Sequence, residues 1–449
     1  MEKNTLGRGR KQGSGWKSVM VVEQLYGFTK TLLREISQGL DRRLVQTFFD
    51  LLAVIIMQRH RNQGLLLSEL GGQLLGMDRA PAGAKRLSNL LHSKKWTAQA
   101  LADWMWQQGD QKIAESLPAQ EDMYAIWDES EIEKAESLQA ERLCPVRSVK
   151  ARRLKRIKTG YFNPPGGRPV FVPGFHWFQV VVTGLKGLPC LAHFHWWTTR
   201  GKTASHMREE EGEVLRQVET RWGRRVIHVW DRGFAGEPWL TQAFAVHVRF
   251  ILRWKKGNYL IDAQGNRRKA SDISRRKRSI DHRLIYDCKR RCERKTGIVF
   301  FPVTLPTLPE HILWMVVSRP GAGRQPWYLL TNEPITSAEE AWRIVFGYNR
   351  RWQIETAFRF DKSELAIESI RLLDWAARQK LMLIVAVVHA FLLSLLSPTC
   401  QPLRQWLLST WCHRTGKRSL SAEAPLYRLR LALSALWIAF RPFSLPRLN

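Results

Sequence analysis

Three acidic residues could together bind the metal ions that phosphodiester chemistry uses. Asp128 follows the apolar run 125–127, Asp231 follows the apolar run 226–230, and Glu355 lies in a predicted helix further along the chain. Two divalent ions about 4 Å apart activate the attacking oxygen and stabilise the leaving one, so several carboxylates must converge. Each aspartate is expected to leave a buried strand where a sheet ends, as sites in open α/β sheets do. Taken alone, an acid in this position is also typical of a turn or a helix cap.

The predicted helix that carries Glu355 has a polar face. Its polar residues recur at intervals of 3, 4 and 7: Tyr348, Arg351, Glu355 and Lys362. At about 100° per residue they occupy a sector of about 60°, and Trp352 and Arg359 extend the same face. The apolar residues Ile354, Ala357 and Phe360 lie on the opposite half and can face the protein interior. An ordinary solvated surface with Glu and Arg pairs four residues apart would give a similar face.

These residues resemble a known family. The pattern Tyr348-x2-Arg351-x3-Glu355-x6-Lys362 matches, at every spacing, the Tyr-Arg-Glu-Lys signature of the bacterial insertion-sequence DDE transposases, the insertion-sequence-four family and its relatives. The motif 231–234 (Asp-Arg-Gly-Phe) looks like that family's second-aspartate motif, and Asp128 after its strand looks like the first. The resemblance covers about residues 120 to 400.

The resemblance implies a fold, a site and a cofactor. The implied fold is α/β: a ribonuclease-H-like mixed sheet flanked by helices, with a β-rich insertion between the second aspartate and the glutamate. The gap of 355 − 231 = 124 residues leaves room for that insertion. The implied catalytic residues, which bind two Mg²⁺ ions or Mn²⁺ as a substitute, are Asp128, Asp231 and Glu355. The implied DNA-binding residues are Tyr348, Arg351 and Lys362 on phosphates near the scissile bond, Arg359 on the same face, and Trp327, on which a flipped base would stack.

Some residues leave alternatives open. Familiar members of the family usually have small or hydroxyl residues after the first aspartate, whereas Glu129-Ser130-Glu131 follows here, so Glu129 is an alternative ligand. With 20 Trp in the chain, a core position is the alternative for Trp327. The basic run 147–158 could be a DNA-binding loop or a solvated one.

Charge and composition indicate the partner. The chain has 449 residues, a formal net charge of +31 and a sequence pI near 10.5, which favour nucleic acid as the partner. An anionic membrane surface is the competing interpretation, but a 44% hydrophobic content is typical of a packed globular chain. The longest apolar run, 381–396, contains His389 and falls short of the roughly 18 to 20 residues that span a bilayer, so a buried helix is expected.

The same features suggest where the protein works. The N-terminal residues are polar and basic with no apolar core behind them, so a cytoplasmic, nucleoid-associated bacterial protein is expected. Six cysteines form no disulfide framework and suit a reducing compartment. Cys288 and Cys292 could be half of a zinc site, but no second pair lies at ligand spacing.

The order of apolar patterns predicts four regions. Residues 1–120 are predicted to be a separate helical DNA-binding domain, 121–256 with 326–398 the catalytic domain, 257–325 a β-rich insertion domain, and 399–449 a helical basic C-terminal region. Strands are expected at 123–127, 178–182, 188–197, 226–230, 250–254, 283–286, 298–303, 312–317 and 327–331, and helices at 204–222, 239–246 and from Ser337.

The interpretation that joins these features is a cut-and-paste DNA transposase. It would cleave transposon ends and join the 3′-hydroxyl to target DNA, through a hairpin intermediate, as a homodimer on double-stranded DNA with no small-molecule substrate and no membrane. Two other hypotheses remain: a non-catalytic DNA-binding regulator derived from a transposase, and a ribonuclease-H-like endonuclease that cleaves without joining strands.

Overall fold

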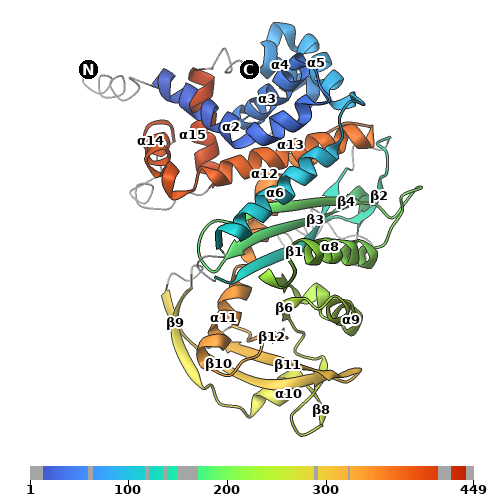
Figure 1. Ribbon diagram of the computed structural model, residues 1–449, viewed down its shortest axis with the longest axis vertical. Helices are drawn as coiled ribbons and strands as arrows, with labels where there is room; N and C mark the ends of the chain where they lie inside the picture. Colours follow the sequence, from blue (N-terminus) through green and yellow to red (C-terminus); the bar gives the residue numbers. More distant parts are fainter. Residues whose placement is uncertain are drawn as a thin grey trace, which may run out of the picture.

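The computed structural model describes residues 14–58, 64–116, 121–134, 139–149, 170–287, 292–321, 324–412 and 426–440. Residues 150–158 of the basic run 147–158 and Cys288 lie outside these ranges. Three regions follow one another along the long axis of the molecule (Figure 1). Helices from both ends of the sequence lie at one end, a sheet with flanking helices lies in the middle, and a strand-rich region lies at the other end.

The middle region is built on a mixed sheet. Its strands are β1 (Met123–Glu133), β2 (Cys144–Arg147), β3 (Phe171–Gly184), β4 (Cys190–Trp197), β5 (Val226–Trp230) and β6 (Arg249–Arg253). β1, β5 and β6 run parallel, whereas β3 is antiparallel to β1 and pairs with β2 and β4 on its other edge. All five residues of β5 are buried, as expected for a strand covered on both faces. The five strands expected here are confirmed, although β1 and β3 extend well beyond the expected bounds.

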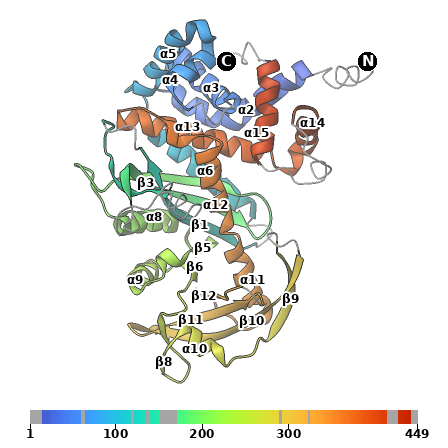
Figure 2. The ribbon, with the colours of Figure 1, turned by 180° about the vertical axis from the view of Figure 1, so that it is seen from behind.

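Aromatic contacts show which helices cover each face of this sheet. One face is covered by α6 (Ala98–Ser116), α8 (Met207–Trp222) and α9 (Glu237–Ala245), where Trp106 packs against Trp222 at 5.1 Å between ring centroids. The other face is covered by α12 (Trp352–Ser363), whose Phe358 meets Trp177 of β3 edge-on at 4.8 Å. Figures 1 and 2 show α8 and α12 on opposite sides of the strands. The face of β1 that α12 covers can therefore contact side chains from that helix.

The strand-rich region continues the same hydrogen-bonded sheet. Its elements are β7 (Tyr259–Ile261), β8 (Arg267–Lys269), α10 (Ala270–Arg275), β9 (Asp281–Asp287), β10 (Cys292–Leu305), β11 (Leu308–Arg319) and β12 (Trp327–Thr331). β12 pairs with both β6 and β11, so the ladder runs without interruption from the middle region into this one. The β-rich character expected for 257–325 is confirmed. The domain boundaries assigned from the sequence stay predictions.

The helical end of the molecule is organised around α13 (Trp375–Ser394). The surrounding helices are α2 (Ser14–Ser37), α3 (Arg42–Met57), α4 (Leu67–Leu75), α5 (Ala80–His92), α14 (Gln401–Trp411) and α15 (Leu426–Ala439), with short 3₁₀ turns at Met77–Arg79 and Pro398–Cys400. By length and composition α13 could span a bilayer, but 89% of that stretch is buried among these helices and the sheet. The expected buried helix is therefore confirmed. The residues of α13 are apolar on all sides, and α3, α5 and α6 pack against it. A separate helical DNA-binding domain at 1–120 stays a prediction.

Candidate active site

Strand register brings the first two acids together. Ile126 of β1 pairs with Val229 of β5 in parallel, and Asp128 and Asp231 each lie two residues beyond that pair. The two carboxylates therefore occupy equivalent positions on neighbouring strands, on the face that α12 covers. Asp128 does not close its strand as predicted. It lies inside β1, because the long antiparallel partner β3 continues to pair with β1 as far as Glu133, and Asp128 faces Gln179 there.

Asp231 ends β5 and begins a tight turn. It is the N-cap of the 3₁₀ turn Arg232–Phe234, and its carboxylate accepts a hydrogen bond from the backbone N–H of Gly233. A Cβ added to Gly233 would lie 2.8 Å from Oδ1 of Asp231, closer than real Cβ contacts come. A side chain at this position would therefore displace the Asp231 carboxylate, and glycine leaves room for it to lie across the turn.

Glu355 reaches the same place from α12, but not from the single helix that was predicted. Residues 338–363 form two helices, α11 (Ala338–Asn349) and α12, with Arg350 and Arg351 between them. Hydrogen bonds three residues apart, from Arg351 N–H to the Tyr348 carbonyl and from Ile354 N–H to the Arg351 carbonyl, tighten the chain at this junction. The assumption of about 100° of rotation per residue along one continuous helix is therefore wrong across this junction. The expected inward half is confirmed, since Ile354, Ala357 and Phe360 are buried.

Arg351 joins two of the three acids. Its guanidinium donates to Oδ2 of Asp128 at 3.2 Å and also donates to Oε1 of Glu355, one turn further along α12. Arg351 is only 7% exposed, so this charged bridge is largely shielded from solvent. A buried bidentate guanidinium holds carboxylates in a defined geometry.

The electrostatics confirm that the three acids interact. Burial and the nearby carboxylate of Asp231 raise the pKa of Asp128 to about 7, against the lowering effect of Arg351, and Glu355 adds to the increase. Burial lowers the pKa of Arg351, but Tyr348 and Glu355 outweigh it, so the net pKa is raised. The site therefore concentrates negative charge that a single arginine offsets only in part.

This donor set fits a divalent cation in its chemistry. Carboxylate oxygens are the ligands that Mg²⁺ and Mn²⁺ prefer, and a cation would relieve the repulsion that raises the pKa of Asp128. In the described part of the chain, no three His, Cys, Asp or Glu side chains already stand in a closed metal-binding group. Arg351 stands between Asp128 and Glu355 instead.

The other predicted DNA-contacting residues differ in their accessibility. Tyr348 is buried at the end of α11, and burial raises its pKa. Lys362 is half-buried, donates to the carbonyl of Glu131 and lies 3.6 Å from the carboxylate of Glu368. Arg359 is exposed. Of the three cationic side chains predicted to grip phosphate, Arg351 and Lys362 thus already contact protein oxygens.

Two tryptophans lie beside the acids. Trp327 begins β12, is half-buried, meets the ring of Tyr348 edge-on at 5.2 Å and has the Arg253 guanidinium over its face at 5.8 Å. Trp352, which begins α12, is 44% exposed, with Arg351 at 5.5 Å from its ring. The sequence placed Trp352 on the polar face, but only the structure shows that it is the more accessible indole.

Close packing fixes the helix that leads into the site. A Cβ on Gly347 would lie 2.4 Å from the ring of Tyr124, so glycine allows α11 to approach β1 directly.

Glu129, the alternative ligand, lies on the opposite face of β1 from Asp128, 3.4 Å from Nδ1 of His176. It therefore does not converge with Glu355.

Comparisons with known proteins identify the family to which this chain belongs. Residues 166–391 match the family described as "Transposase DDE domain". Among solved structures, the chain is similar to the piggyBac transposase in a synaptic complex with hairpin DNA, at 12% identity and a TM-score of 0.39, over 96% of this chain and 82% of that one. The family match spans half of the sequence, and the chain belongs to the transposase DDE domain family.

Proposed function

We propose that this protein cleaves the ends of a DNA transposon and joins the freed 3′-hydroxyl to target DNA, as a member of the insertion-sequence-four group. The observation that carries the proposal is the convergence of Asp128, Asp231 and Glu355 from β1, β5 and α12, with Arg351 bridging two of them. A DNA-binding regulator would not need three acids in one place. The repulsion among them destabilises the fold, and such costly clusters of acids are typical of functional sites.

The proposed fold of the catalytic region is ribonuclease-H-like. The strand order β4-β3-β1-β5-β6, with the first three antiparallel and the last two parallel to β1, supports this assignment. In this arrangement the acids come from the central strand, its parallel neighbour and the helix that follows the insertion. The insertion between β6 and α11 then lies next to the acids.

The proposed role of each side chain follows from its position. Asp128, Asp231 and Glu355 would hold two Mg²⁺ ions, which when bound supply Lewis-acid activation of the attacking and leaving oxygens. Arg351 orients two of these carboxylates and adds positive charge beside the scissile phosphate. Lys362 holds the carbonyl of Glu131, so it fixes the end of β1 against α12 as well as contributing charge.

Capture of an unpaired base is a further proposal, because hairpin formation requires the DNA end to be distorted. An exposed indole can stack on a base and compensates about 1 to 3 kcal/mol of lost base stacking. Trp327 was predicted for this role, but it already packs against Tyr348 and lies under Arg253. Trp352 is more exposed, so we propose that both indoles contribute, with Trp352 as the main stacking face.

The partners follow from charge and reaction. A net charge of +31 suits double-stranded DNA, and joining two ends in one event calls for a homodimer on DNA. We propose a nucleoid-associated, cytoplasmic site of action. A nuclease that never joins strands is the second candidate, since the same acids would serve it.

The decisive experiment incubates the protein and Mg²⁺ with labelled duplexes that carry the DNA bordering its coding region. Nicks, hairpins and strand-transfer products are separated on denaturing gels. Asp231→Asn and Glu355→Gln should remove all three products, whereas Glu219→Gln, a matched change on α8, should leave them unchanged. Activity that survives Asp231→Asn contradicts the three-acid site, and nicking without joined products favours the nuclease.

The same assay distinguishes the roles of the two tryptophans. Trp352→Ala and Trp327→Ala should both reduce hairpins relative to nicks, with the larger loss for Trp352→Ala. Phenylalanine at either position should restore part of the loss, because a phenyl ring still stacks. Unchanged hairpin yield in both alanine variants would rule out base capture by this pair.

A further inference from the structure

A basic pocket of about 390 Å³ lies between the candidate active site and the strand-rich region. Its wall contains five cationic residues: Arg232, Arg253, Lys256, Arg275 and Arg319. Two aromatic residues, Trp254 and Tyr328, and two hydroxyl residues, Ser271 and Ser274, complete most of the lining. Among the described residues, the lining contains no acid, so all of its charged side chains are cationic.

The charge is available to a ligand. Within the described ranges, none of the five cations forms an ion pair with a carboxylate, in contrast to Arg249, Arg343 and Arg351. Arg319 is fixed instead by two backbone carbonyls, those of Lys277 and Ser274, each at 2.7 Å. Carbonyl oxygens orient a guanidinium but do not neutralise it. Positive charges held together without counterions favour an anionic ligand.

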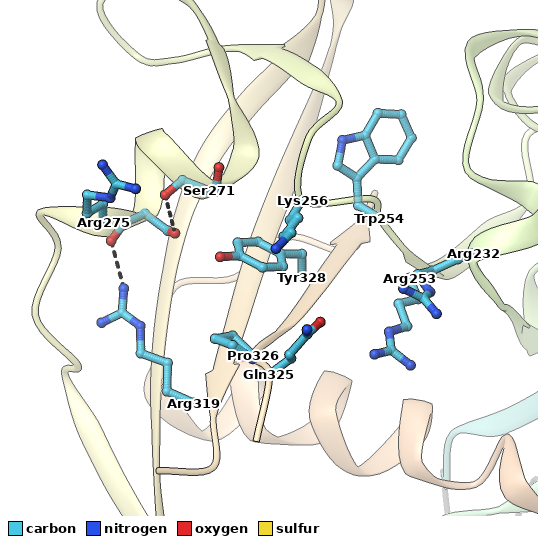
Figure 3. A pocket seen from close by; sticks show the side chains of 11 residues that line it. Arg232, Arg253, Trp254, Lys256, Ser271, Arg275, Arg319, Gln325, Pro326 and Tyr328 are labelled. Atoms are coloured by element: carbon cyan, nitrogen blue, oxygen red, sulfur yellow. Dashed lines mark hydrogen bonds between the residues drawn. The ribbon is translucent and has the colours of Figure 1, made fainter. Parts of the chain in front are cut away.

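The pocket leads away from the acids. Arg232 directly follows Asp231, and Arg253 lies over Trp327, so this end adjoins the candidate active site. Arg275 of α10 and Arg319 of β11 form the other end, with Lys256 and Tyr328 between the two ends (Figure 3). Cations are therefore distributed along the pocket rather than gathered at one point.

The size and lining favour one strand of DNA over a duplex. A pocket of about 390 Å³ falls near the lower end of the range for small-molecule sites, far too small for a double helix. Successive phosphates of a single strand follow a line of cations, and aromatic residues along such a line suit unpaired bases. Tyr328, half-buried between the two cationic ends, lies where a base or sugar would pass.

We propose that this pocket binds a single DNA strand that leaves the active site unpaired, by gripping its successive phosphates. The proposal rests on the proposed function, because strand cleavage next to Asp231 supplies such a strand. Its contacts lie outside the three acids, so binding can be measured separately from cleavage.

The test measures binding without cleavage. Fluorescence anisotropy in EDTA follows a labelled oligothymidylate and a labelled blunt duplex, each titrated with protein over a range of KCl concentrations. The test variant is Lys256→Ala/Arg275→Ala, since both side chains are exposed, and Arg319 is spared because it bonds backbone carbonyls. The matched control is Arg267→Ala/Lys269→Ala, which removes two exposed cations from β8 in the same region. Thermal melting verifies that both variants are folded.

The slope of the logarithm of the single-strand binding constant against the logarithm of the KCl concentration should become less steep. Two lost phosphate contacts should reduce its magnitude by about 1.4, at roughly 0.7 per contact. Extrapolated from 1 M salt, that corresponds to about 25-fold weaker binding at 0.1 M. The duplex should change much less, and the control variant should leave the single-strand slope near that of the parent protein. Equal losses for strand and duplex, or a test variant that matches the control, would overturn the proposal. If the protein cleaves no DNA but the test variant still has a less steep single-strand slope than the control variant, only the proposed function is contradicted.

Discussion

Asp361 of α12 forms a buried polar contact that holds the glutamate-bearing helix against the sheet. Its Oδ1 lies 2.7 Å from Nδ1 of His389 in α13, and its Oδ2 accepts from Nε2 of Gln179 at 3.4 Å. All three residues are at most 1% exposed. Gln179 is also the cross-strand neighbour of Asp128. One carboxylate therefore connects α12, α13 and the strand beside the first acid.

The expected effect of Asp361→Ala follows from this burial. Removing one partner of a buried pair leaves the other without compensation and costs about 3 to 5 kcal/mol in the free energy of unfolding. Asp361→Asn keeps an oxygen acceptor for one of the two contacts, so its cost should be nearer 1 to 2 kcal/mol. Because α12 also carries Glu355, a loosened helix should reduce DNA cleavage more than DNA binding.

Chemical denaturation followed by tryptophan fluorescence gives the free energies, and the cleavage assay gives the rates at a temperature where each variant is folded. Glu23→Ala, an exposed acid on α2, is the matched control and should change stability by less than about 0.5 kcal/mol. The reasoning fails if Asp361→Ala costs no more than this control. It also fails if Asp361→Asn loses as much cleavage activity as Asp361→Ala, because then the retained oxygen has no positioning role.

Three further substitutions test separate parts of the structure. Gly347→Ala should destabilise the protein by about 1 to 3 kcal/mol through overpacking, whereas Gly27→Ala, at an exposed position of α2 with open space around it, should stabilise it by about 0.4 to 1 kcal/mol; a stabilised Gly347→Ala in denaturation would contradict the close approach. Gly233→Ala should reduce DNA cleavage with little change in melting temperature, because its Cβ presses on the Asp231 carboxylate; normal cleavage would show that this carboxylate can move freely. Burial lowers the pKa of His193 to about 3, so between about pH 6.5 and 3 mainly the unfolded chain takes up this proton, and stability falls with falling pH by up to about 1.4 kcal/mol per unit. Buried His228 has a similarly lowered pKa, so His193→Gln should reduce that slope without abolishing it in denaturation curves collected from pH 7 to pH 4, and an unchanged slope would refute the assignment.

Much of the fold could be predicted because the signals were local. The strands Val226–Trp230 and Trp327–Thr331 have the expected bounds, since each is a short apolar run between turn-forming residues. The start of α11 was also predictable, because Ser337 and Glu340 form a capping box that satisfies the first backbone N–H groups. Burial of the 381–396 run followed from its composition alone.

Other features depended on tertiary contacts that a sequence pattern does not contain. The extension of β1 past Asp128 arises from pairing with β3, whose residues are up to about 50 positions away in the chain. The junction at Arg351 interrupts the helical pattern without a proline, and it orients the guanidinium toward Asp128 and Glu355. The basic pocket likewise gathers residues from a turn, a strand end and a short helix.

The three acids are held by three different physical restraints. Register with β5 places Asp128, a glycine-dependent turn places Asp231, and a buried pair in the second half of α12 places Glu355. Because these restraints share no residue, changes to them should act independently on stability. Their effects on cleavage should nevertheless combine less than additively, because one displaced carboxylate already disables the shared site. A double-mutant cycle between Gly233→Ala and Asp361→Asn, read in both denaturation and cleavage, distinguishes these two behaviours.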